Sequence, residues 1–368
     1  MVDGLRPDIS CYPKHSNEKG TNFGLMEFWI ELKSRDDPFK GVEDTTPDTL
    51  KAKDIVGQLM SYAVPQLTSG FWTHCFSVFV FGHMARLIRW DRAGAIVTEA
   101  FDIQDESNLL LDFCQRYDQS TPEQRGHDQS VCVPKTKDRE TAFTALTPIR
   151  GEGEEESAFN KRKADIVKEK LVEYLVNDTV TGAVKRFIGP PPKKQIMSLQ
   201  GRSTRGCPVY DVESGKVCYL KDTWRVDSPE LMKEGDTYTV LHQNKVSRIA
   251  GVVAHGDLVP TAISGSRADT SVSNRSKRGS IPPYTSQCTH PHINNHITQT
   301  DKLCKSDWTI GPCRPQVQGY VHYRLVLNVV GRDLTSFKSS KEVLRVFIDA
   351  LTGMRLLFIM MLIGSDNL

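Results

Sequence analysis

The sequence predicts an α+β protein built from two units of mixed secondary structure. Alternating apolar and polar residues at 27–34 and at 321–331 are typical of half-buried strands. Between such stretches lie segments, such as Lys51 to Tyr62, whose apolar residues recur at helical spacing. A length of 368 residues gives room for two domains of ordinary size.

Residues 1–135 are predicted to form an N-terminal α/β domain. After the strand at 27–34 and the helix that follows it, three apolar segments separated by turns at Gly82 and Gly94 predict an antiparallel meander. Residues 107–117 then carry apolar side chains at helical spacing and predict a closing helix.

The pattern weakens over residues 136–195, which we interpret as a linker with one helix. An acidic low-complexity run at 151–157 and the proline-rich segment GPPPKK interrupt this region. Between them, residues Lys161 to Asn177 are predicted to form the helix.

The second domain is predicted over residues 196–368. It begins with two extended runs joined by a turn at Ser214-Gly215, and Lys221 lies near the end of the second run. Ser228 is the expected N-cap of the next helix, with Pro229 at its first position. Residues 248–259 then predict a pair of strands.

A polar stretch at 260–314 is predicted to be a disordered insertion, because it has too few apolar residues for a packed core. The alternating strand at 321–331 follows it. Ser339 and Glu342 have the spacing of a capping box and predict a final helix. The apolar run Leu356 to Ile363 is too short to span a bilayer.

Charge and cysteine usage limit the class of protein. A net charge of +2 identifies no partner, and we expect neither a nucleic acid nor a membrane. The nine cysteines are odd in number and scattered, which predicts reduced thiols in an intracellular protein, cytoplasmic or nuclear. Six residues in or beside the insertion have side chains that bind zinc: Cys288, His290, His292, His296, Cys304 and Cys313. Their spacing matches no standard zinc motif, which favours a polar loop over a structural metal site.

Lys221 has two interpretations from its surroundings alone. It is either a lysine at the edge of a sheet that extends to water, or a lysine held against a phosphate.

Five segments resemble the fungal-type protein kinase family. They are RLIRWDRAGAIVTEAFD, GRSTRG, YLKDTWR, HYRLVLNVVGRDLTSF and SSKEVLRVFIDAL, and they occur in the family's order across both domains. The resemblance implies a protein-kinase-like small lobe (N-lobe) in the second domain.

In such a lobe a strand lysine pairs with the phosphates of ATP and with a helix glutamate. The resemblance assigns these roles to Lys221 and Glu234, with Glu230 as second choice. It makes Gly201 to Gly206 the phosphate-covering loop, with a serine where the middle glycine belongs. Asn328 to Gly331 would be the hinge that holds adenine.

The rest of the kinase pattern does not occur in these 368 residues. A His-Arg-Asp catalytic loop and an Asp-Phe-Gly magnesium site are absent from the sequence, and the family pattern is expected to stop after Gly353. We therefore expect a lobe truncated before the catalytic loop, with no catalytic residue, weak ATP binding and no phosphoryl transfer. A broken gene model and a genuine truncation both remain open. The alternative is a pseudokinase-type scaffold, with a protein partner at the exposed hinge and the C-terminal face.

The first domain carries a separate set of charged residues. Asp8, Glu31 and Lys33 form a PD…E-x-K pattern, and Gln58 and Tyr62 lie one turn apart on the next helix. This resembles the restriction-endonuclease-like fold, in which two carboxylates hold magnesium and the lysine orients the attacking water. The competing interpretation is a salt-linked strand face on a non-catalytic scaffold. We expect the three side chains to converge without nuclease activity.

Overall fold

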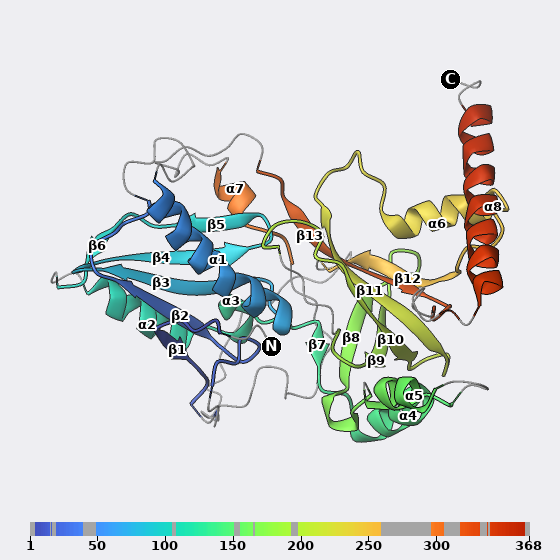
Figure 1. Ribbon diagram of the computed structural model, residues 1–368, viewed down its shortest axis with the longest axis horizontal. Helices are drawn as coiled ribbons and strands as arrows, with labels where there is room; N and C mark the ends of the chain where they lie inside the picture. The colour runs from blue at the N-terminus through green and yellow to red at the C-terminus, as the bar shows by residue number, and fades with distance from the viewer. Residues whose placement is uncertain are drawn as a thin grey trace, which may run out of the picture.

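The computed structural model describes residues 4–14, 16, 20–39, 49–104, 108–150, 155–164, 166–192, 198–258, 296–304, 317–331, 337 and 339–364, with side chains through residue 352 apart from Ala158. These residues form two β-sheets that lie side by side, with helices around each (Figure 1). The α+β class predicted from the sequence is confirmed.

The first sheet has six strands in the order β1-β2-β3-β4-β5, and β6 also pairs with β4. The strands are β1 (Ile9–Cys11), β2 (Phe28–Lys33), β3 (Cys75–Phe81), β4 (Met84–Asp91), β5 (Gly94–Val97) and β6 (Phe101–Asp102). β2 and β3 are parallel, and helix α1 (Leu50–Ser69) connects them. The strand at 27–34 and the antiparallel meander are confirmed.

Helix α1 packs its apolar face on this sheet. Thr49 caps its first turn by accepting a hydrogen bond from the Ala52 N–H, and Leu59 and Tyr62 are buried against Trp29 of β2. Gln66 joins this core as well, because its side chain accepts a hydrogen bond from the Trp29 indole. The helix expected at 51–62 therefore exists and continues to Ser69. The predicted closing helix is α2 (Leu109–Gln119), and the short α3 (Pro122–Arg125) follows it.

The second sheet has seven antiparallel strands in the order β12-β13-β11-β10-β9-β8-β7. The strands are β7 (Val131–Cys132), β8 (Val172–Asn177), β9 (Val184–Gly189), β10 (Arg205–Asp211), β11 (Val217–Val226), β12 (Val252–Asp257) and β13 (Tyr320–Leu327). Because β7 already pairs with β8, this sheet begins before residue 135.

The prediction of a linker with one helix at Lys161 to Asn177 is wrong. Helices α4 (Thr136–Leu146) and α5 (Glu156–Ala164) occupy the first part, and residues 172–177 are strand β8. Strand β9 then completes this part of the sheet. The first five residues of β8 are all buried, and a strand covered on both faces has a continuous apolar run that resembles a buried helix.

Two further predictions in the second domain are wrong. The helix expected from Ser228 is α6 (Glu234–Gln243), with Lys233 as its N-cap. Its start is set by a tertiary contact, since the Gly235 N–H donates to the Tyr323 hydroxyl at 2.8 Å. The strand pair expected at 248–259 is the single strand β12.

Residues 296–304, inside the predicted insertion, belong to the packed structure. The Thr298 N–H donates to the Tyr320 carbonyl, so this segment pairs with β13, and helix α7 (Thr300–Cys304) follows. The carboxylate of Asp91 in β4 accepts hydrogen bonds from the Gln299 and Thr300 N–H groups. The segment thus contacts both sheets. The rest of the predicted insertion, residues 260–295 and 305–314, lies outside the described residues.

Cys132 is disulfide-bonded, so the expectation that every cysteine is a reduced thiol is wrong at this residue. Among the described residues, five cysteines are free thiols: Cys11, Cys75, Cys114, Cys207 and Cys218. Among the helices that the structure describes, none has the length and apolar character needed to cross a bilayer.

The final helix, α8 (Ser340–Gly364), extends beyond the second sheet on the side away from the first (Figure 1). The Glu342 N–H donates to the Ser339 hydroxyl, which confirms Ser339 as its cap. An ion pair between Arg248 and Asp349 connects the helix to the chain after α6. The apolar side chains that the sequence places on one face of this helix, including Phe347 and Leu351, are largely exposed.

Candidate functional site

The centre of the candidate site is an ion pair between β11 and α6. The Lys221 Nζ donates to both carboxylate oxygens of Glu234, at 2.7 and 2.6 Å, and both side chains remain about a quarter exposed. Such a pair holds the ammonium group extended toward solvent, where a phosphate could reach it. Glu230, the second choice, lies in the exposed turn before α6.

Strand β11 is central in its sheet, with β10 on one side and β13 on the other. Lys221 lies opposite Gly206 of β10 and Leu325 of β13. The interpretation of Lys221 as a lysine at a sheet edge is therefore wrong.

Gly235 brings Glu234 to the lysine. A Cβ atom at this position would overlap the imidazole ring of His255 in β12, so only glycine lets the first turn of α6 approach the sheet this closely. The Tyr323 hydroxyl accepts from the Gly235 N–H and fixes the same turn. The close approach places the Glu234 carboxylate within hydrogen-bonding distance of Lys221.

The segment before β10 lies beside this ion pair. The Arg202 carbonyl accepts hydrogen bonds from the Trp224 N–H at 2.7 Å and the Thr223 hydroxyl at 2.9 Å, which attaches the segment to β11. The Arg202 guanidinium lies 3.9 Å from Glu234 and is largely exposed. Arg202 is thus a second cation at the site. In the sequence, only its position next to Gly201 in the predicted loop indicates this role.

Ser203 occupies the position where the kinase pattern has its middle glycine. Its φ of 43° lies in the left-handed region that glycine favours, and its buried hydroxyl oxygen has no hydrogen-bond partner. Gly201 has a φ of 108°. The backbone therefore keeps a glycine-like conformation at Ser203, and the buried hydroxyl of this residue is left without a partner.

Gly206, the other glycine assigned to the covering loop, lies inside strand β10. A side chain there would overlap the phenol of Tyr219, which is on the same face of the sheet as Lys221. Gly206 thus provides space for Tyr219, and the loop itself is confined to the residues before Arg205.

The segment assigned as the hinge follows β13. The Asn328 N–H donates to the Gly251 carbonyl at 2.9 Å, and the Asn328 side chain accepts from the Gly251 N–H at 2.8 Å. Val329 and Val330 beyond it are exposed. The segment thus offers apolar side chains and backbone groups at one end of β13.

The opposite face of β11 carries a buried ionic cluster. The Asp222 carboxylate accepts from Arg324 at 2.9 Å, from Arg205 at 2.8 Å and from His322 at 2.7 Å. Burial alone would raise the pKa of Asp222, but these three cationic or donor groups hold it well below its usual range. Arg324 also donates to Asp128 at 3.0 Å.

The sequence reasoning missed this cluster. Arg324 is fully buried and donates further to the Ser130 and Leu175 carbonyls. Its one sequence signal was a charged residue in the middle of an otherwise apolar strand. The cluster lies on the face of β11 opposite Lys221, and its Asp222, His322 and Arg324 side chains are buried. It is therefore part of the core of the sheet and does not belong to the candidate site.

In the first domain the structure brings Asp8, Glu31 and Lys33 together. Asp8 accepts a hydrogen bond from the Leu32 N–H at 2.7 Å, and the Lys33 ammonium lies 2.5 Å from one oxygen of Glu31. Burial raises the pKa of Glu31, and the nearby charge of Asp8 adds to this shift. The predicted convergence of the three side chains is confirmed.

Helix α1 supplies the neighbours of this group. The Gln58 amide donates to the Tyr62 hydroxyl at 2.8 Å, and Tyr62 donates to the Arg6 carbonyl. The second carboxylate oxygen of Glu31 is buried without a partner. Of the six cysteine and histidine residues around the insertion, only His296 and Cys304 lie in the described part of the chain.

Comparison with known proteins gives one match. The family model described as fungal protein kinase matches residues 72–363, which is more than three quarters of the chain. The match continues ten residues past Gly353, so the expected loss of the family pattern at that point is wrong. Comparison with curated proteins found no match, and comparison with solved structures found none either. The two-sheet architecture, the paired lysine and glutamate and this match lead to one conclusion: the chain belongs to the fungal protein kinase family.

Proposed function

We propose that this chain binds ATP through Lys221 and does not transfer phosphate by itself. The observation that carries the proposal is the contact of Lys221 with both oxygens of Glu234 on a partly exposed face of the sheet. In protein kinases this pair holds a lysine against the α- and β-phosphates. Two features make the residues present fit the nucleotide.

The first feature is charge. Arg202 and Lys221 place two cations near one carboxylate, which leaves a net positive charge for a phosphate. The second is the backbone of the same segment, because Gly201 and Ser203 both have the positive φ that lets a loop approach a ligand closely. Bound ATP would bring magnesium between its own phosphates, and the chain would orient the phosphates through Lys221. Because the sequence contains no His-Arg-Asp or Asp-Phe-Gly motif, we infer that these residues do not complete phosphoryl transfer.

Replacing Lys221 by alanine tests the nucleotide site. We expect the Kd of ATP, measured by isothermal titration calorimetry, to rise on the order of tenfold or more, because a charge-assisted hydrogen bond contributes about 1.5–3 kcal/mol. Lys216→Ala is the matched control, since Lys216 is an exposed lysine in the same hairpin. The proposal fails if both variants bind ATP as the unaltered chain does, or if the unaltered chain does not bind it.

A phosphotransfer assay tests the second half of the proposal. With labelled ATP, magnesium and a generic protein acceptor, we expect incorporation at background level. Incorporation that Lys221→Ala removes would show that the chain is an active kinase.

A second candidate function is magnesium binding by Asp8 and Glu31. It is favoured by the partnerless, buried oxygen of Glu31 and by the nearby Asp8 charge, since a divalent cation would relieve both. We infer loose binding without cleavage, because magnesium held by one or two carboxylates usually needs substrate phosphates as further ligands.

Magnesium titration without nucleotide tests this site. We expect millimolar Mg²⁺ to raise the Tm of the chain and expect Glu31→Gln to abolish the increase. Glu99→Gln, which changes an exposed glutamate beside the same sheet, should retain it. If Mg²⁺ raises the Tm of all three proteins equally, the magnesium binds elsewhere. Magnesium-dependent cutting of DNA or RNA that Glu31→Gln abolishes would show nuclease activity.

A further inference from the structure

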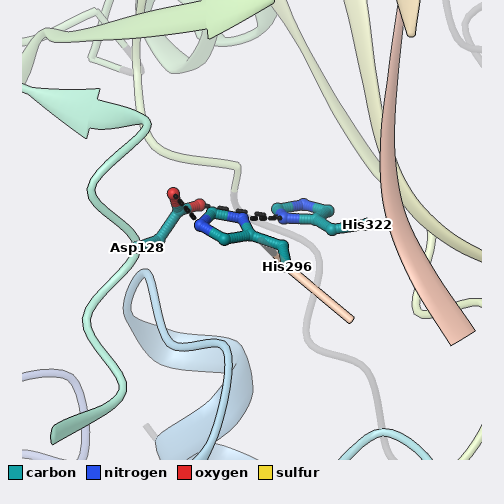
Figure 2. A group of neighbouring side chains, drawn as sticks. All are labelled: Asp128, His296 and His322. Atoms are coloured by element: carbon teal, nitrogen blue, oxygen red, sulfur yellow. Dashed lines mark hydrogen bonds and ion pairs between the residues drawn. The ribbon is translucent and has the colours of Figure 1, made fainter. Parts of the chain in front are cut away.

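Two histidines and an aspartate meet at the junction of the two sheets, away from the nucleotide site. Asp128 lies between α3 and β7, His296 precedes α7, and His322 lies on β13 (Figure 2). All three side chains are at least 95% buried. One ligand atom of each lies within 4.8 Å of those of the other two. Three segments that are far apart in the sequence therefore direct metal-binding atoms at one point.

The backbone fixes the two imidazole rings opposite each other. The His322 N–H donates to the His296 carbonyl at 3.0 Å, and the His296 N–H donates to the Leu258 carbonyl at 2.9 Å. The rings are nearly parallel, and their Nδ1 atoms are 3.1 Å apart. Strand pairing therefore places the two backbones side by side, and the contact with Asp222 orients the His322 ring.

The carboxylates around the rings indicate which nitrogens carry protons. The Nε2 of His322 lies 2.7 Å from an Asp222 oxygen, which requires a proton on that nitrogen. The Nε2 of His296 faces an Asp128 oxygen at 3.6 Å, and a proton there avoids contact between two lone pairs. With the proton of each ring on Nε2, the two Nδ1 atoms would face each other with their lone pairs at 3.1 Å. A proton shared between the two nitrogens, or a metal ion bound by both, removes this repulsion.

The separation of the two Nδ1 atoms fits one metal ion bound by both rings. A neutral imidazole is the form that binds metal ions. Zinc binds histidine nitrogens at ~2.0–2.1 Å, which puts two nitrogens of a tetrahedral ion at about 3.3 Å from each other. The observed separation of 3.1 Å is close to that value. Asp128 supplies a third ligand, with its Oδ2 at 3.9 Å from the His322 Nδ1.

His322 also has the second contact that metal-bound histidines show. Its distal nitrogen donates to the carboxylate of Asp222, which orients the ring and strengthens it as a ligand. This contact is independent of the three ligands. It holds the ring with its Nδ1 atom toward His296.

We propose that Asp128, His296 and His322 bind one divalent transition-metal ion of the zinc class. The ion has a structural role, because it joins the segment before β7, the segment before α7 and β13. Arg324 contacts Asp128 and Asp222, and Arg205 contacts Asp222, so the two carboxylates are already balanced by two guanidinium groups. The affinity must then come from the imidazole nitrogens, which select zinc, copper or nickel over magnesium and calcium.

Metal analysis of the purified full-length chain tests the proposal. After equilibrium dialysis against Zn²⁺ we expect one zinc per chain, and a Tm that chelation lowers and Zn²⁺ restores. Mg²⁺ at the same concentration should neither replace the zinc nor restore the Tm. A chain that stays metal-free in excess Zn²⁺ would overturn the proposal and would indicate that the two rings share a proton.

His296→Gln separates this site from any other zinc site on the chain. We expect the variant to lose the zinc, whereas His83→Gln, a change at an exposed histidine of the first sheet, should retain it. Retention of one zinc by His296→Gln would contradict the assignment.

X-ray absorption of the zinc-loaded, unaltered chain covers the case in which His296→Gln does not fold. The spectrum should show two imidazole ligands with oxygen and no sulfur, whereas a sulfur ligand would assign the ion to cysteines and overturn the proposal.

Discussion

Arg324→Ala is expected to lower the free energy of unfolding by about 3–5 kcal/mol, the cost of removing one partner from a buried ion pair. The loss leaves Asp128 and Asp222 with fewer partners in the core and removes the donors to the Ser130 and Leu175 carbonyls. Since domains are stable by only about 5–15 kcal/mol in total, this loss would remove a large part of the stability of the chain. Urea denaturation followed by tryptophan fluorescence measures the change.

Arg248→Ala is the matched control for this prediction. Arg248 also forms an ion pair, with Asp349, but both side chains are about half exposed. Exposed pairs contribute at most about 1 kcal/mol, so this variant should unfold near the urea concentration of the unaltered chain. Similar midpoints for the two variants would show that the buried cluster does not stabilise the sheet.

Gly235→Ala is expected to damage both stability and nucleotide binding. The added methyl group overlaps the His255 ring, so α6 must move away from β12 at a cost of about 1–3 kcal/mol. The movement withdraws Glu234 from Lys221, and the Kd of ATP should rise as it does in Lys221→Ala. Thermal melting and calorimetric titration of one preparation measure the two effects.

The control for this substitution is Gly57→Ala in α1. Gly57 is exposed, and a Cβ at that position meets no atom within 4 Å. Alanine is favoured over glycine inside a helix by about 1 kcal/mol, so this variant should melt at a higher temperature than the unaltered chain and bind ATP equally well. A Gly235→Ala protein that behaves like Gly57→Ala would refute the role assigned to Gly235.

The elements that the sequence predicted are those whose pattern is local. Strand β2, helix α1 and the hairpin of β10 and β11 show periodicity or turn residues within a few positions of each other. Strand β8 was mistaken for a helix because burial on both faces removes the alternation. The first residue of α6 could not be predicted from the local sequence either, since the start of this helix depends on contacts with His255 and Tyr323, which come later in the chain.

The same distinction applies to the candidate sites. The Lys221–Glu234 pair was found through a family resemblance, and Asp8, Glu31 and Lys33 through alternation along a strand. Nothing local indicates that Asp222 contacts Arg324, because 102 residues separate them. His296 was noted only as part of a cysteine- and histidine-containing loop, and its partner His322 only as a residue of an alternating strand.

The alternation of Lys221 and Asp222 on β11 has a consequence for how the chain folds. A shift of β11 by one residue would bury the ammonium group of Lys221 and expose Asp222. The strand register of β11 is therefore strongly constrained. One neighbour of β11 is β10, which is adjacent in the chain, but the other is β13, synthesised about a hundred residues later. Strands so far apart in the sequence pair slowly, because a long segment of chain must first be closed into a loop. The buried ionic cluster therefore specifies the register of the sheet, because every buried charge has an oppositely charged partner only when the strands pair correctly.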